Sequence, residues 1–119
     1  MSGYLTTHVL DIAQGIPASQ MAIQVWRHDT TGARALQKTV HTGTNGRPEE
    51  PLLAGEDFTT GTYELIFAVG AYFATQHLPM SEPPFLGDVP IRFSIADENA
   101  HYHVPLLVSP WAYSTYRGS

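Results

Sequence analysis

Thr62-Tyr-Glu-Leu-Ile-Phe-Ala-Val69 is the stretch that decides the fold. Every second residue of this segment is large and apolar, namely Tyr63, Leu65, Phe67 and Val69. Side chains two residues apart on an extended chain point to the same face, so this pattern predicts a strand with one face turned to a core.

Segments of the same kind lie on both sides of this stretch and are separated by Gly, Pro, Asn and Asp. The predicted strands are residues 5–12, 22–28, 36–42, 62–69, 89–95, 101–108 and 111–116. The predicted turns are residues 15–17, 29–32 and 44–47, and residues 48–51 contain two prolines that confine this segment to an edge or a loop. One short helix is predicted at residues 71–77, before Pro79. This order predicts an all-β fold, a two-sheet antiparallel sandwich of Greek-key type with seven or eight strands.

Length and composition limit the possible classes of protein. A chain of 119 residues suits one domain, expected to span residues 1–119. The net charge of −5, with six scattered Lys and Arg residues, argues against a nucleic acid or an anionic membrane as partner. The chain has no cysteine, which excludes disulfides, thiol catalysis and cysteine-ligated zinc. The N-terminal residues lack the pattern of a signal peptide, and a cytoplasmic protein is expected.

Six histidines are candidates for chemistry, because the pKa of histidine lies close to neutral pH. His101 and His103 are two residues apart on a predicted strand and therefore share a face. His8 shares a face with Thr6 in the first predicted strand, and Arg47 follows the Asn-Gly turn. In isolation, His8 and Arg47 are better explained as exposed polar residues. The same explanation is favoured for the remaining histidines, which are His28, His41 and His77.

Three segments together indicate a family. They are Leu5-Thr-Thr-His-Val-Leu-Asp11, His101-Tyr-His-Val-Pro-Leu-Leu-Val-Ser-Pro110 and the C-terminal Tyr113-Ser-Thr-Tyr-Arg-Gly-Ser119. Read together, they resemble the 5-hydroxyisourate hydrolases, the purine-degrading relatives of transthyretin. The Tyr-Arg-Gly-Ser ending separates that enzyme from the hormone carrier, and the resemblance extends over nearly the whole chain.

The resemblance implies a transthyretin-like sandwich with a lone helix, and a specific reaction. That reaction is the hydrolysis of 5-hydroxyisourate to 2-oxo-4-hydroxy-4-carboxy-5-ureidoimidazoline in urate degradation, by attack of water on a ring amide and without a cofactor or metal. The family positions match His8, Arg47 and His103 as catalytic residues, and His8, Arg47, Tyr116 and Ser119 as substrate-binding residues. The resemblance also implies a homotetramer, a dimer of dimers with active sites in the groove between dimers. The low charged content of 14% and the apolar Leu106, Val108 and Trp111 near the C-terminus are compatible with it.

The residue types fit this chemistry. Water needs a base, the growing oxyanion needs a cation or hydrogen-bond donors, and the leaving nitrogen needs an acid. Two histidines can share the base and acid roles, although the sequence does not say which one activates water. Arg47 offers two parallel N–H donors and keeps its charge. Tyr116 offers a hydroxyl, and Ser119 offers a hydroxyl or the terminal carboxylate.

Three alternatives stay open at this point. The first is a transthyretin-like carrier that binds a small molecule without turnover. The second is a zinc hydrolase in which His8, His101 and His103 hold the metal and water takes the fourth position. The third is a purely structural β-sandwich, which leaves the histidines and the C-terminal segment without a purpose.

Overall fold

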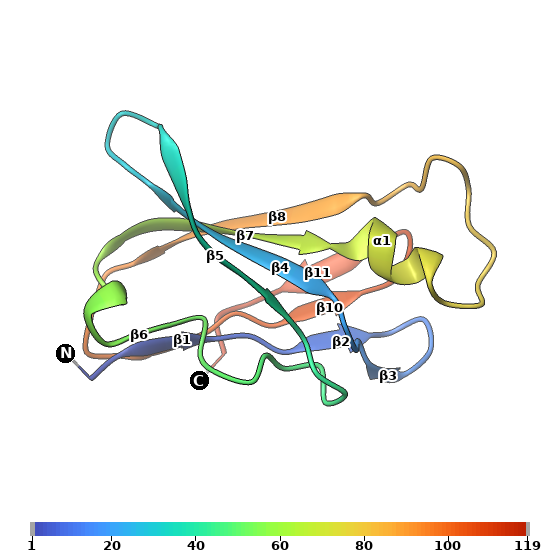
Figure 1. Cartoon of the computed structure of the whole chain (residues 1–119), viewed down its shortest axis with the longest axis horizontal. Helices are drawn as coiled ribbons and strands as arrows, with labels where there is room; N and C mark the ends of the chain where they lie inside the picture. Colours follow the sequence, from blue (N-terminus) through green and yellow to red (C-terminus); the bar gives the residue numbers. More distant parts are fainter. Residues whose placement is uncertain (1, 119) are drawn as a thin grey trace.

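A four-stranded antiparallel sheet forms one layer of the computed structural model, which describes residues 2–118 (Figure 1). Its strand order is β5-β4-β7-β8. The strands are β4 (Ala22–His28), β5 (Arg34–His41), β7 (Gly61–Ala68) and β8 (Asp88–Ile95). Pro90 lies in β8. This strand is at the edge of its sheet, so its open side has no hydrogen-bond ladder that the missing N–H of proline could interrupt. The central strands β4 and β7 carry the apolar face that the sequence predicted.

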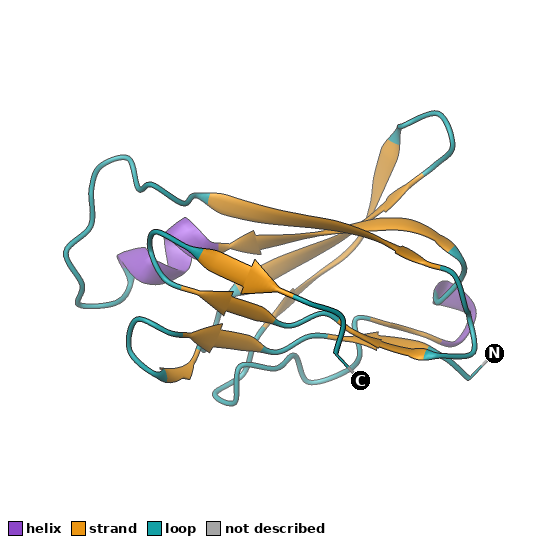
Figure 2. Cartoon of the chain, turned by 180° about the vertical axis from the view of Figure 1, so that it is seen from behind, coloured by secondary structure: helices purple, strands orange, loops and turns teal. Residues whose placement is uncertain are grey.

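Two smaller sheets form the opposite layer (Figure 2). Their orders are β6-β1-β9 and β11-β10-β2-β3. The strands are β1 (Tyr4–Thr6), β2 (Val9–Asp11), β3 (Ile16–Pro17), β6 (Leu53–Ala54), β9 (His101–His103), β10 (Leu106–Val108) and β11 (Tyr113–Thr115). A 3-10 turn at Gly55–Asp57 follows β6. The described residues thus form more, shorter strands than the seven or eight that the sequence predicted.

The extra strands come from an interruption of two predicted ones. Residues 5–12 divide into β1 and β2, and residues 101–108 divide into β9 and β10. Pro105 has no N–H to donate, and the N–H of Val9 donates to Gly46 O at 2.9 Å instead of to the neighbouring strand. The segments nevertheless stay side by side, because Val104 N donates to Thr6 O and Leu106 N to His8 O, both at 3.0 Å. The candidate histidines lie at this interruption.

One part of the predicted topology is wrong. β1 pairs with β9, and β2 with β10, in parallel, so the sandwich is not purely antiparallel. Parallel strands need a long connection, and almost the whole chain separates the N-terminal from the C-terminal segment, so the connection allows this direction. The parallel pairing brings the two histidine-bearing segments together.

The helix α1 (Val69–Ala74) starts two residues earlier and ends earlier than the predicted 71–77. It follows β7 directly, and Val69, Tyr72 and Phe73 face the core at helical spacing. Tyr72 donates its hydroxyl hydrogen to Asp11 Oδ2 at 2.8 Å, which joins the helix to β2. Burial and the Asp11 carboxylate raise the pKa of Tyr72 above its ordinary value.

The core lies between the layers and consists of the inward faces of both. Its members with no exposed surface include Leu5, Val9, Ile23, Val25, Leu52, Phe58, Leu65, Phe67, Phe73, Leu106 and Val108. Leu106 and Val108 therefore stabilise the single chain and offer no surface to a second one. Within residues 2–118, the one α-helix is too short to cross a membrane.

Candidate active site

His8 and His103 reach one face of the interrupted layer from two neighbouring segments. Thr6 of β1 lies opposite His103 of β9 in the parallel register. Thr7 and Val9 point into the core, where both are buried, whereas Thr6 and His8 are partly exposed. This confirms the predicted alternation. Because residues two apart share a face, His8 lies on the same side of the layer as Thr6 and His103.

Arg47 is held beside them by a tight turn. Gly43 N donates to Arg47 O at 2.8 Å, and Arg47 N donates to Asn45 Oδ1 at 2.9 Å. Gly46 has a φ of +78°, and a Cβ at this position would lie 2.5 Å from Val9 O and 3.1 Å from His8 Cδ2. Only glycine can occupy a site that combines left-handed backbone with such close approach. The Asn-Gly turn therefore packs directly against the segment that carries His8.

The same turn determines which ring nitrogen of neutral His8 carries the hydrogen. Its Nε2 lies 2.9 Å from the carbonyl oxygen of Asn45. A carbonyl oxygen only accepts, so Nε2 carries the hydrogen and donates it. The lone pair of neutral His8 is then on Nδ1.

The positive charge of Arg47 acts on both histidines. Burial, followed by this charge, lowers the pKa of His8 below its ordinary value. Burial, Arg47, His101 and His8 lower the pKa of His103, in that order of importance. At a given pH both rings therefore carry a second proton less often than a free histidine does. A general base must be unprotonated before it can accept a proton, and the lowered pKa favours this state in both histidines.

His101 and His103 do share a face, as predicted, and they share a partner as well. Thr6 Oγ1 lies 2.7 Å from Nε2 of His101 and 2.8 Å from Nδ1 of His103. Tyr4 stacks on the ring of His101 with centroids 4.1 Å apart. No role was predicted for Thr6 or Tyr4 from the sequence, where the one signal is that Thr6 shares a face with His8. Its contact with the second pair follows from the parallel pairing, which was not predicted.

The C-terminal segment packs against His103. Gly118 N donates to His103 O at 2.7 Å, and a Cβ on Gly118 would lie 2.6 Å from His103 Cδ2. The guanidinium of Arg117 lies over the ring of Tyr102, 4.0 Å from its centroid. Up to Gly118, the segment is therefore ordered by specific contacts. Ser119, a predicted substrate-binding residue, lies outside the described residues.

Tyr116 lies apart from the histidines. It is 59% exposed and lines a hollow of about 310 Å³ together with Tyr102, Val104 and residues of β8. A smaller hollow of about 190 Å³ lies beside Arg47 and is lined by Thr6, Thr7 and residues 48–51. The structure thus brings His8, Arg47 and His103 together, while Tyr116 faces a different hollow. Its role in substrate binding stays a prediction.

Comparison with known proteins identifies the family. Residues 5–118 match the family described as HIUase/Transthyretin. The chain belongs to the HIUase/transthyretin family. The resemblance and the transthyretin-like sandwich that the sequence predicted are both confirmed.

A 5-hydroxyisourate hydrolase, an (S)-allantoin synthase and a transthyretin are all similar to this chain. The 5-hydroxyisourate hydrolase 2 of Rhizobium meliloti (strain 1021) is 54% identical over 99% of this chain and 98% of its own length. The solved structure of an (S)-allantoin synthase matches with a TM-score of 0.94 and 47% identity, over 99% of this chain and 44% of that longer chain. Sea bream transthyretin in complex with thyroxine matches with a TM-score of 0.85 but only 27% identity, over 96% of this chain and 93% of that one. The chain is therefore much more similar in sequence to the Rhizobium hydrolase than to this transthyretin.

The zinc alternative requires three histidines around one point. Among residues 2–118, no three His, Cys, Asp or Glu side chains lie together so that they could hold a metal ion. His101 and His103 instead direct one ring nitrogen each at the hydroxyl of Thr6.

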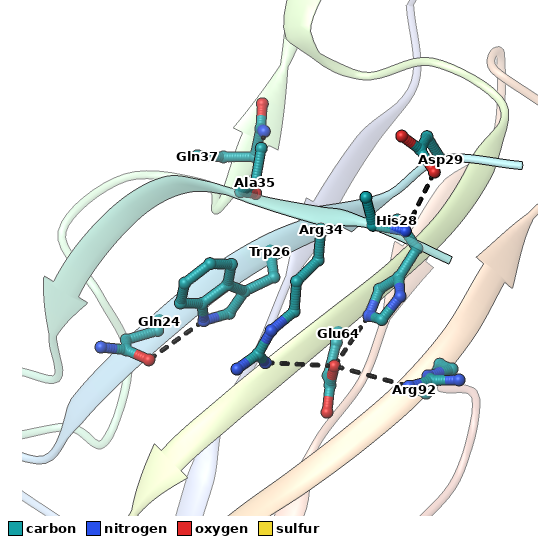
Figure 3. A network of polar contacts seen from close by, with 10 residues as sticks. Gln24, Trp26, His28, Asp29, Arg34, Ala35, Gln37, Glu64 and Arg92 are labelled. Atoms are coloured by element: carbon teal, nitrogen blue, oxygen red, sulfur yellow. Dashed lines mark hydrogen bonds and ion pairs between the residues drawn. The ribbon is translucent and has the colours of Figure 1, made fainter. Parts of the chain in front are cut away.

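One of the histidines regarded as solvated is not. His41 and His77 are exposed, but the side chain of His28 is only 9% exposed, and its Nε2 lies 2.7 Å from Glu64 Oε1 (Figure 3). Glu64 itself is buried on the outer face of the four-stranded sheet, where Arg34 also reaches it at 3.5 Å. His28 was predicted to be solvated because it lies at the end of its strand. In the structure, β5 and β7 both extend far enough to pair with this last residue and to cover its side chain. This cluster lies on the other layer from His8 and His103.

Proposed function

We propose that this protein hydrolyses 5-hydroxyisourate in urate degradation. The observation that carries the proposal is the juxtaposition of His8, Arg47 and His103, with the charge of Arg47 acting on both rings. It occurs in a chain that is 54% identical over nearly its full length to a 5-hydroxyisourate hydrolase. The three residues come from segments far apart in the sequence, and the fold gathers them at one interruption of a sheet.

His103 is the base in this proposal. Its Nδ1 faces Thr6, which leaves Nε2 to receive a proton from water, and its lowered pKa keeps it neutral. As the proton moves to Nε2, the water oxygen bonds to the ring carbonyl of the substrate. The resulting imidazolium then returns the proton to the leaving nitrogen as the ring C–N bond breaks. One histidine thus serves as base and then as acid.

Arg47 stabilises the negative charge that develops on the substrate, and His8 helps to position the substrate or the attacking water. Arg47 is exposed beside its hollow and stays protonated, so it can bind the developing oxyanion through its N–H groups. His8 has its Nε2 occupied by Asn45 and presents Nδ1 as an acceptor, which suits a hydrogen bond to a substrate N–H or to the attacking water. Tyr116 and Ser119 remain proposed substrate contacts.

A direct assay tests the proposal. The substrate is generated in place from urate, and its loss is followed optically with and without the protein. We expect a decay much faster than the spontaneous one, and unchanged after treatment with a chelator. A decay no faster than the spontaneous one, combined with measurable binding, would favour the carrier. A rate abolished by the chelator would favour the zinc hydrolase.

The proposal includes a homotetramer, built as a dimer of dimers. Both layers end in strands with an open edge, β8 in one and β11 in the other. Large apolar side chains are exposed on or beside the layer that carries the histidines, namely Ile12, Ile16, Trp111, Tyr113 and Tyr116. Such a surface suits burial against further copies of the chain.

A further inference from the structure

One hydroxyl on β1 connects two histidine rings on β9. Thr6 Oγ1 lies 2.7 Å from Nε2 of His101 and 2.8 Å from Nδ1 of His103. A hydroxyl has a single hydrogen, so it donates to one ring and accepts from the other when both rings are neutral. The tautomers of His101 and His103 are therefore coupled through Thr6.

The direction of this chain of hydrogen bonds follows from the role proposed for His103. Its Nδ1 is the nitrogen that the hydroxyl of Thr6 contacts, so Nε2 is the nitrogen left for the attacking water, and a base needs its lone pair there. Nδ1 then carries the hydrogen and donates it to the hydroxyl oxygen of Thr6. With its hydrogen on Nδ1, neutral His103 has its lone pair on Nε2.

His101 is held as the acceptor at the other end. The hydroxyl of Thr6 then donates to Nε2 of His101, whose ring stacks on Tyr4 with an interplanar angle of 12°. A positive charge on His101 lowers the pKa of His103, so the two rings resist being charged together. The other charged or titratable groups that act on His103 are Arg47 and His8.

We propose that Thr6 and His101 are positioning residues that hold His103 in the tautomer with hydrogen on Nδ1 and a free Nε2. The inference rests on the proposed function, because it supplies the base with its lone pair in the right place. When Nε2 takes a proton from water, Nδ1–H keeps donating to an oxygen whose own hydrogen is already given to His101. Thr6 lines the hollow beside Arg47, and the effect that we propose for Thr6 and His101 on turnover acts through His103.

Two pairs of variants test the inference kinetically. Thr6→Val removes the hydroxyl and keeps the shape, whereas Thr6→Ser keeps the hydroxyl. His101→Phe keeps a ring to stack on Tyr4 but loses the acceptor, whereas His101→Gln retains an acceptor. We expect Thr6→Val and His101→Phe to lower kcat roughly tenfold or more, toward the range typical of a misplaced base, with KM little changed. Thr6→Ser and His101→Gln should restore most of kcat.

The pH profile separates positioning from general damage. In Thr6→Val the imidazolium of His103 loses the acceptor of its Nδ1–H, so the acidic limb of kcat/KM should move to lower pH. Thr62→Val is the matched control, because the hydroxyl of Thr62 contacts only Ser94 Oγ at 3.1 Å on the other layer, and this variant should behave as wild type. Circular dichroism confirms that each variant is folded.

A measurement on the wild-type protein needs no variant at all. Imidazole ¹⁵N spectra should show His103 protonated on Nδ1 and unprotonated on Nε2. A hydrogen on Nε2, or a Thr6→Val variant with wild-type kcat and pH profile, would overturn the inference. The spectra do not depend on turnover, so an inactive wild-type protein contradicts the proposed function, while a wrong tautomer contradicts this inference.

Discussion

At the scale of single residues, Arg47 sets the charge of the site. It is exposed on a turn that only glycine at position 46 allows, and its charge lowers the pKa of both His8 and His103. Neither histidine lies near the cluster of His28, Glu64 and Arg34, which is on the other layer. The protonation of the site therefore depends on one turn that two hydrogen bonds, from His8 Nε2 to Asn45 O and from Val9 N to Gly46 O, tie to the histidine-bearing segment.

The first prediction follows from this charge. Replacing Arg47 by Gln should raise the pKa of His8 and of His103, because the neutral side chain no longer disfavours their protonated forms. In the wild type, activity that needs neutral His103 persists below the ordinary pKa of 6.5 and is lost as the pH falls through the lowered pKa. In the variant this loss should begin at higher pH. An NMR titration of the histidine C–H signals checks the shift independently of turnover, and identical titration curves in both proteins would contradict it.

The second prediction concerns the site residues together. His8→Ala, Arg47→Ala and His103→Ala should each lower kcat/KM by roughly 10²-fold or more, the scale of losing an acid–base or oxyanion partner. His77→Ala is the control, because His77 is exposed and lies outside the segments that carry His8, Arg47 and His103, and it should leave the rate unchanged. A His77 variant as impaired as the other three would show that the residues are wrongly assigned.

At the scale of elements, the C-terminal segment depends on β9 for its place. Deletion of residues 116–119 removes the Gly118–His103 hydrogen bond and the stacking of Arg117 on Tyr102, while none of the described residues 116–118 is buried. We expect the sandwich to survive and the activity to be lost. Circular dichroism and turnover of the truncated protein, beside those of the full chain, check both parts. An unaltered rate would remove the segment from the active site.

The ionic cluster on the outer sheet should affect stability and not catalysis. Glu64→Ala leaves Nε2 of His28, whose side chain is 9% exposed, without its partner, which costs about 1–3 kcal/mol of unfolding free energy. Arg92→Gln is the control, because Arg92 is 63% exposed and 3.9 Å from Glu64, and exposed pairs contribute about 0–1 kcal/mol. Urea unfolding gives both values. Equal losses in the two variants would mean that burial of His28 is not what gives the pair its strength.

The sequence predicts these elements better than it predicts how they pair. Alternating apolar residues locate β4, β7 and β8, because each strand contributes one face to the core. The division of residues 101–108 at Pro105 could not be predicted from the proline alone. A proline removes one N–H donor from a ladder, but the chain can continue as an extended strand beyond it. The parallel pairing of β1 with β9 joins residues nearly a hundred positions apart, and no local pattern encodes it. That pairing is what gives Thr6 its two histidines, so this part of the site could not be predicted.

At the scale of the whole molecule, the exposed apolar side chains on the histidine-bearing layer predict an assembly. Trp111 is 60% exposed in the single chain, and Tyr113 is 45% exposed beside it. Burying them against other copies gives roughly 25 cal/mol for each Å² of apolar surface removed from water. Light scattering should find a particle with four times the mass of one chain, as the proposed homotetramer requires.

Placing a charge on this surface should dissociate the assembly. We expect Trp111→Glu to yield smaller species, because a carboxylate buried in an apolar interface loses its hydration without gaining a partner. Leu36→Glu is the matched control, since Leu36 is 47% exposed on β5 of the opposite layer, and it should leave the mass unchanged. If active sites form in the groove between dimers, the activity of the Trp111 variant should fall with its mass on dilution. A monomer with full activity would show that one chain holds the complete site, whereas a dissociated and inactive variant that regains its rate at high concentration would place part of the site on a second chain.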